Sequence, residues 1–343
     1  MTVTGPRPRP RLARPGPQLG IGLAALARPA YITTDRDSDL PRREVEDLRA
    51  RTHEVLDAAW DLGIRYVDVA RSYGRAEEFL AGWLDAHPER RPTVASKWGY
   101  RYVGGWRLDA EVHEVKDHGL VALQEQLGVT RDLLGPRLDI YQVHSLTPDS
   151  PLRSDRAALE RLGEIRDEGV AIGVSVSGPD QASALEAAIA FTAAGRPLVS
   201  VVQATWNLLE RSAEPALEHA HQAGLLVVVK EALANGRLAG RYAPAPLREA
   251  ADSLGVGPDA LALAAALSRP WAGVVLSGAV SVRQLRDNQL AEALSGRSPD
   301  AVPDAVPDAV LEAVPDAVLE ALQRVRAEPA RAYWSGRALR PWT

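Results

Sequence analysis

Short apolar segments alternate with longer amphipathic segments along almost the whole chain, and this alternation limits the fold more than any other feature. The apolar segments have the length and β-branched content of buried strands, and the segments between them have helical spacing. Such alternation is typical of βα units around a parallel sheet. The predicted strands cover residues 19–23, 65–69, 93–97, 138–143, 171–175, 199–203, 226–230 and 273–276. The predicted helices cover residues 43–62, 75–86, 110–126, 156–168, 181–192, 213–223, 258–267 and 282–294.

Eight βα units close a (β/α)8 barrel, a fold of roughly 250 residues. The span 19–294 is close to that length. An open doubly wound sheet uses the same alternation, but it normally carries Gly-x-Gly-x-x-Gly after its first strand. Here Gly20 and Gly22 are followed by Ala25 at the third position. We therefore predict an α/β fold, a (β/α)8 TIM barrel with an extra C-terminal helical segment.

Two segments lie outside the predicted barrel. Residues 1–17 are rich in arginine and proline, and we expect a disordered or extended lead-in there. Residues 299–322 repeat short units in which each proline can occupy the first turn of a helix. We expect a single domain over residues 18–343, with these helices packed outside the barrel.

Composition and charge exclude several classes of function. The chain has 40 Lys and Arg against 45 Asp and Glu, a formal net charge of -5, so we expect no nucleic-acid partner. It has no cysteine, which excludes disulfides and thiolate metal sites and fits a cytoplasmic location. The apolar runs are far shorter than the roughly 20 residues that span a bilayer, so we expect no membrane partner. His219 and His221 point in different directions on a predicted helix, and we expect no metal site.

Polar residues gather at the carboxyl ends of three neighbouring predicted strands, where barrels of this kind place reactive groups. Asp68 lies at the end of the second strand and Tyr73 follows it, Lys97 ends the third strand, and His144 comes directly after the fourth. A half-buried lysine needs a counter-ion, and Asp68 is the nearest candidate. The ammonium favours the phenolate of Tyr73 and so makes it a proton donor. A neutral His144 can orient a carbonyl oxygen.

Each of these residues also has an ordinary interpretation. Asp68 could cap the following helix, Tyr73 could be a packed loop aromatic, and His144 could be a satisfied polar residue. Lys97 is harder to explain in this way, because the chain has only three lysines. Taken together, the four residues favour polarisation of a carbonyl group.

The same segments resemble motifs of the aldo-keto reductase superfamily. Residues 63–74 are similar to its G-x-x-x-x-D-T-A-x-x-Y-G motif, with Val69 replacing the threonine, and residues 138–144 are similar to its L-D-x-x-x-x-H strand. The resemblance extends over residues 18–294 and includes Lys97 after Ser96. It implies that Tyr73 is the general acid, that Lys97 and Asp68 lower its pKa, that His144 orients the substrate, and that a nicotinamide supplies hydride.

The resemblance also implies positions for the coenzyme. Gln203 would hold the nicotinamide amide and Trp206 would stack on its ring, while Val176 replaces a usual asparagine. The loop that contains Leu233 would approach the pyrophosphate. The full set implied for coenzyme binding is Ser175, Gln203, Trp206, Leu233, Gly278, Gln284 and Asn288.

Two positions depart from what a coenzyme site of this family would need. Glu231 would repel a diphosphate unless it is turned away, and either Lys230 or Arg237 could compensate its charge. Val280 occupies the place where many relatives have an arginine for the 2′-phosphate. The resemblance implies NADP(H) as the cofactor, with NAD(H) as the alternative.

The expected activity is the reversible NAD(P)H-dependent reduction of an aldehyde or ketone, sugars included, to an alcohol. Two alternatives stay open: a Schiff-base aldolase or lyase that uses Lys97 or Lys230, and a cofactor-bound regulatory module with little turnover. Several aromatic residues either wall a substrate pocket or cover the barrel rim: Trp98, Tyr100, Tyr102, Trp106, Trp334 and Trp342. The partner is a small carbonyl compound, and the sequence gives no oligomeric state.

Overall fold

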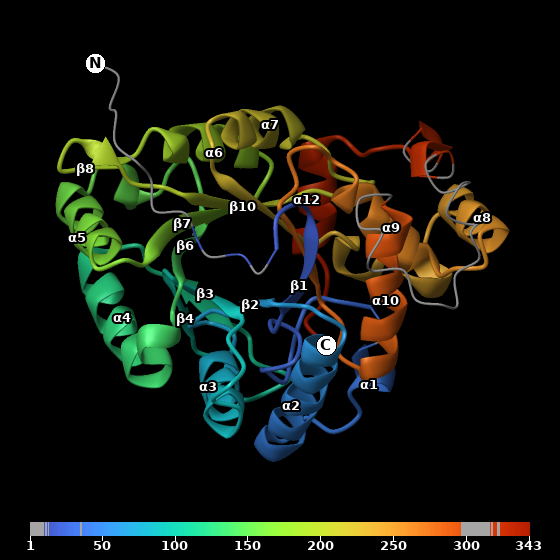
Figure 1. Ribbon diagram of the computed structural model, residues 1–343, viewed down its shortest axis with the longest axis horizontal. Helices are drawn as coiled ribbons and strands as arrows, with labels where there is room; N and C mark the ends of the chain where they lie inside the picture. The colour runs from blue at the N-terminus through green and yellow to red at the C-terminus, as the bar shows by residue number, and fades with distance from the viewer. Residues whose placement is uncertain are drawn as a thin grey trace.

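The computed structural model describes residues 10, 12, 14–34, 36–295, 316, 318–320 and 323–343. Within them, eight parallel strands close into a barrel in the order β1-β12-β11-β10-β7-β6-β3-β2, surrounded by helices (Figure 1). The barrel strands are β1 (Gln18–Gly22), β2 (Tyr66–Asp68), β3 (Thr93–Trp98), β6 (Ile140–Leu146), β7 (Ala171–Val176), β10 (Val201–Thr205), β11 (Leu226–Lys230) and β12 (Val274–Ser277). The predicted (β/α)8 barrel is confirmed, and each predicted strand overlaps one of these.

Helices cover the outside of the barrel, mostly where the periodicity predicts them. They are α2 (Val45–Asp61), α3 (Ala76–Ala86), α4 (Leu120–Leu134), α5 (Arg156–Asp167), α6 (Gln181–Ile189), α7 (Glu214–Gln222), α9 (Pro258–Leu267) and α10 (Val282–Leu294). Three more helices were not predicted individually: α1 (Arg36–Asp39), α8 (Ala245–Ser253) and α12 (Ala330–Ala338). Helix α12 is part of the extra C-terminal helical segment that the sequence predicts. The lead-in over 1–17 and the repeat over 299–322 lie largely outside the described residues.

Two predicted helices have wrong boundaries. The helix predicted over 110–126 begins only at Leu120, because the preceding residues form a hairpin of β4 (Tyr100–Tyr102) and β5 (Glu114–Lys116). The helix predicted over 181–192 ends at Ile189, before a small hairpin of β8 (Thr192–Ala193) and β9 (Arg196–Pro197). In both cases the residues predicted as helix pair with a nearby strand, β5 with β4 and β8 with β9, although their apolar residues have helical spacing.

The barrel interior is layered, because alternate residues of each strand point inward. One layer is apolar and consists of Tyr66, Ala95, Ile140, Ala171, Val201, Val228 and Val274. Two positions further along their strands are Asp68, Lys97, Gln142, Gln203 and Lys230. A polar layer therefore follows the apolar one at the carboxyl ends of the strands.

Among the described residues, no single helix is long and apolar enough to cross a bilayer, and only α8 and α9 taken together, across a bend of 93°, pass such a test.

The turn after Tyr73 requires a glycine. Gly74 has a φ of +59°, and a Cβ placed on it would lie 2.3 Å from the carbonyl oxygen of Ala27. The backbone of the loop after β1 therefore packs directly on this turn and fixes the start of α3, just beyond Tyr73.

We expect Gly74→Ala to lower the free energy of unfolding by about 2 kcal/mol, because it adds a left-handed L-residue and a backbone clash. Gly128→Ala on α4 is the matched control, since its Cβ would meet no atom within 4 Å. A helical alanine should stabilise by about 0.5–1 kcal/mol. Urea unfolding of both variants checks the prediction, and equal effects would contradict it.

Candidate active site

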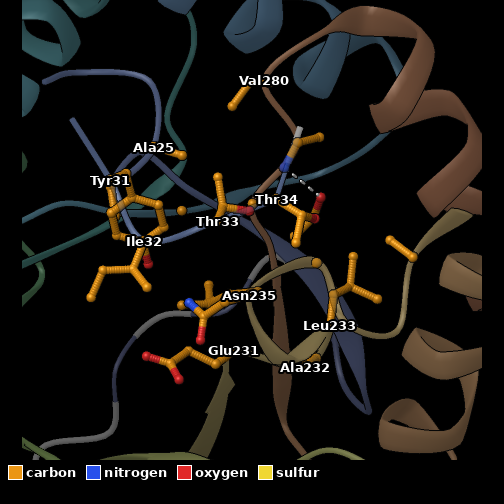
Figure 2. Close-up of a pocket in the computed structure, with 18 of the residues that line it drawn as sticks. Ala25, Tyr31, Ile32, Thr33, Thr34, Glu231, Ala232, Leu233, Asn235 and Val280 are labelled. Carbon is orange, nitrogen blue, oxygen red and sulfur yellow. Dashed lines mark hydrogen bonds between the residues drawn. The ribbon is translucent and has the colours of Figure 1, made fainter. Parts of the chain in front are cut away.

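A cavity of about 730 Å³ lies at the carboxyl ends of the barrel strands. Asp68, Tyr73 and His144 line one part of it, and Gln284 and Asn288 line another. Figure 2 shows a part of the cavity wall, where residues 31–34 lie opposite Glu231, Ala232, Leu233 and Asn235. The cavity thus brings together residues from most of the barrel strands.

A buried ion pair forms the base of the site. Lys97 has no exposed surface, and its Nζ donates to Asp68 Oδ1, to the Val69 carbonyl at 3.1 Å and to the Tyr73 hydroxyl at 3.4 Å. Asp68 Oδ2 accepts from the amides of Gln203 at 2.8 Å and Gln142 at 3.3 Å. Groups of the protein therefore compensate both charges.

Tyr73 and His144 meet directly above this pair. Their rings lie edge to face with centroids 5.4 Å apart, and the Lys97 ammonium is 4.8 Å from the Tyr73 ring centroid. Ser72 Oγ lies 3.3 Å from Nδ1 of His144. The structure thus brings the four predicted catalytic residues to one point.

The pKa of Tyr73 responds to Asp68 in the direction opposite to the one expected. Burial raises the pKa of Tyr73 well above its ordinary value of 10.0, and the negative charge of Asp68 raises it further. Asp68 therefore favours the phenolate only indirectly, by holding the Lys97 ammonium in place, while its own charge disfavours the phenolate. The prediction that Asp68 itself lowers the pKa of Tyr73 is wrong, because the two negative charges oppose each other.

His144 has the opposite shift. Burial lowers its pKa well below 6.5, and the positive charges of Lys97, Lys230 and Arg28 lower it further. The imidazole is therefore neutral at physiological pH. A neutral ring can donate one hydrogen bond and accept another.

A second cation, which no sequence pattern predicts, lies beside the phenol. The Arg28 guanidinium is buried, lies 5.0 Å from the Tyr73 ring centroid and pairs with Glu114 at 2.8 Å. It also lies over the rings of Tyr31 at 4.8 Å and Trp342 at 4.9 Å. Its charge lowers the pKa of Tyr73 and so opposes the effect of burial. No local pattern marks Arg28, because its partners come from distant segments.

Most of the predicted coenzyme residues line the cavity, namely Gln203, Leu233, Gly278, Gln284 and Asn288. Two do not. Trp206 is fully buried, donates to Glu214 at 3.2 Å and packs on Trp271, so we withdraw its assignment to the nicotinamide. Ser175 is also buried, and its Oγ accepts from the Ser145 amide at 2.8 Å.

Two amide side chains suit a ligand that offers amino groups. Gln203 Oε1 and Asn288 Oδ1 are buried acceptors without a hydrogen-bond partner among the described residues, although the other end of each amide is engaged. They lie on β10 and α10, in different parts of the cavity wall. A nicotinamide dinucleotide carries an amino group at each end, so these residues fit it.

In the loop after β11, the charge of Glu231 is compensated by a cation from another segment. Its carboxylate is turned to Arg337 of α12, which donates three hydrogen bonds of 2.6 to 3.1 Å. Arg237 pairs with Glu328 instead, and Lys230 donates to Thr205 Oγ1 at 3.2 Å. The charge that compensates Glu231 therefore comes from Arg337, and neither Lys230 nor Arg237 supplies the close pair.

Some of the aromatic residues predicted to wall a substrate pocket or to cover the barrel rim line the cavity, and others do not. Tyr100 and Trp342 line the cavity, and Trp342 stacks on His113 with ring centroids 4.4 Å apart. Trp98 is fully buried in the core, and Trp334 packs on Tyr333. Tyr102 and Trp106 contact each other in the hairpin loop. A part of the predicted set therefore walls the cavity.

Comparison with known proteins places the chain in a family. The Aldo/keto reductase family matches residues 37–297 of the chain. An uncharacterized oxidoreductase of Bacillus subtilis, YqkF, is 29% identical over 265 residues, which are 68% of this chain and 79% of that protein. Pyridoxal 4-dehydrogenase of Microbacterium luteolum is 29% identical over 119 residues, but these cover only 29% of this chain and 34% of that enzyme.

The fold has close counterparts among solved structures. The holo form of aldo-keto reductase AKR11C1 from Bacillus halodurans superposes with a TM-score of 0.63 at 21% identity, covering 91% of this chain and 94% of that chain. The family match extends over most of the barrel. The chain therefore belongs to the aldo/keto reductase family.

Proposed function

We propose that the protein reversibly reduces an aldehyde or ketone to an alcohol with a nicotinamide dinucleotide, and that Tyr73 is its general acid. The observation that carries the proposal is the contact of the Tyr73 hydroxyl with a buried, ion-paired ammonium at 3.4 Å. When bound, the nicotinamide supplies the hydride. Gln203 and Asn288 would hold the two ends of the dinucleotide.

The chain's own groups then position and protonate the carbonyl oxygen. Tyr73 and His144 both face the cavity and are both neutral, so each can donate a hydrogen bond to that oxygen. Ser72 Oγ lies 3.3 Å from Nδ1 of His144, and donation by this hydroxyl would leave the ring proton on Nε2. As negative charge develops on the oxygen, Tyr73 transfers its proton, and Lys97 and Arg28 stabilise the phenolate that forms.

We expect Tyr73→Phe to lower kcat for carbonyl reduction by about 10²- to 10⁴-fold, because the variant retains the ring but lacks the proton. Its affinity for the reduced coenzyme, measured by quenching of tryptophan fluorescence, should stay within about threefold of wild type. Tyr102→Phe is the matched control, since Tyr102 lies outside the cavity wall. Turnover of Tyr73→Phe near the wild-type rate would remove Tyr73 from this role.

The charges of Arg28 and its neighbours predict a pH effect. The charged groups that act on Tyr73 are Lys97, Asp68, Arg28, Glu114 and Glu231. Arg28→Met removes a positive charge and leaves Glu114 without its partner, and both changes raise the pKa of Tyr73. Alcohol oxidation needs the phenolate, so its rise with pH should move to higher pH, whereas Arg28→Lys should keep the wild-type profile. Coincident profiles for Arg28→Met and wild type would contradict this role.

The choice between the two coenzymes rests on the end of the cavity near α10. Val280 offers no charge, and Arg283 is paired with Asp287 at 3.5 Å. The carboxylates of Asp39 and Asp259 also line this part of the wall. The two carboxylates oppose a 2′-phosphate, and we therefore propose NAD(H), whereas the resemblance alone puts NADP(H) first.

We expect NADH to bind more tightly than NADPH in separate fluorescence titrations. Val280→Arg should strengthen NADPH binding about tenfold, because an arginine–phosphate hydrogen bond contributes roughly 1.5–3 kcal/mol. NADH binding should not change in that variant. A wild-type preference for NADPH would restore the coenzyme that the resemblance implies.

A second candidate function uses Lys230 as a Schiff-base nucleophile. Lys230 lines the cavity, and burial together with Arg337 and Lys97 lowers its pKa to about 8, although Glu231 opposes the change. Lys97 is unsuited to this role, because its ammonium is fully buried and ion-paired. Borohydride treatment with a carbonyl panel tests the candidate. We expect no lysine adduct in wild type, and an adduct lost in Lys230→Met would favour the lyase.

A further inference from the structure

Glu231 is a buried anion in the wall of the proposed coenzyme cavity. Its side chain has 8% of its surface exposed and lines the cavity next to Ala232 and Asn235 (Figure 2). Its backbone has a φ of 53°, a conformation that L-residues rarely adopt. Such a residue persists only where its surroundings hold it.

Two contacts hold Glu231 independently of each other. Asn207 donates to its backbone carbonyl at 2.9 Å, and Arg337 holds its carboxylate in a bidentate pair. Asn207 also contacts the Tyr333 hydroxyl at 3.1 Å, so α12 is docked by a second polar contact. Loss of the Arg337 charge would therefore leave the carboxylate near its present place.

A second cation, Lys230, lies further from the carboxylate than Arg337, and Arg237 is paired elsewhere. Lys230 Nζ lies 3.9 Å from Oε1 and donates to Thr205, while Arg237 pairs with Glu328. Arg337 is thus the main counter-charge, and the burial of the pair limits screening by water. Without Arg337, only the more distant ammonium of Lys230 would offset the negative charge that faces an anion in the cavity.

We propose that Arg337 is a positioning residue for coenzyme binding, which acts by neutralising Glu231 so that the negatively charged diphosphate of a dinucleotide can occupy the cavity. The inference rests on the proposed function. It assigns to α12, which lies outside the barrel sheet, a direct part in coenzyme affinity (Figure 1).

A double-mutant cycle separates charge from structure. The dissociation constant of NADH, and separately of NADPH, is measured by tryptophan fluorescence for wild type, Arg337→Met, Glu231→Gln and the double variant. We expect Arg337→Met to weaken binding at least tenfold and Glu231→Gln to strengthen it severalfold, because the latter leaves the cation without the anion. The double variant should return to within about threefold of wild type.

Arg331→Met is the matched control, since Arg331 lies on the exposed side of the same helix. It should bind coenzyme like wild type. Circular dichroism and thermal unfolding check that α12 and the barrel are intact in every variant.

Three results would overturn the proposal: unchanged affinity in Arg337→Met, a double variant as weak as Arg337→Met, or no gain in Glu231→Gln. The affinity of Glu231→Gln is measured with Arg337 in place, so it tests the proposal even if Arg337→Met fails to fold. Absence of coenzyme binding by wild type would instead refute the proposed function.

Discussion

The buried ammonium of Lys97 is the constraint on which the rest of the site depends. A lysine without exposed surface requires a counter-ion and further hydrogen-bond acceptors, and strand β2 together with the segment that follows it supplies both. The counter-ion in turn needs donors, which come as amides from β6 and β10. Only a closed barrel places these strand ends around one point. The fold is therefore required for the chemistry of the site as well as for its stability.

The sequence predicts the barrel and the four residues at its mouth, because both follow from local patterns. β-Branched runs identify the strands, and the period of two places Asp68 and Lys97 on the inner face. The same period could have corrected Trp206. Gln203 points inward, and a residue three positions later belongs to the opposite face of an extended chain. The aromatic ring accordingly packs among the helices, against Trp271.

What the sequence could not predict are contacts between distant segments. Arg28 lies in a loop after β1, and its partners Glu114 and Trp342 come from the β4–β5 hairpin and the segment after α12. Arg337 is 106 residues from Glu231. Neither pair leaves a periodic signal in the sequence. The hairpin was also misread as helix, because its spacing is compatible with both and only the pairing of Arg101 with Val115 decides.

Burial and charge act in opposite directions on the two groups that face the substrate. Burial keeps the proton on Tyr73 and removes it from His144, so both are neutral hydrogen-bond donors at physiological pH. The cations around them favour the phenolate and disfavour the imidazolium. A carbonyl oxygen that gains negative charge would thus find one donor ready to lose its proton and another that keeps it. The same pair of cations, Lys97 and Arg28, therefore assigns proton transfer to the tyrosine and orientation to the histidine.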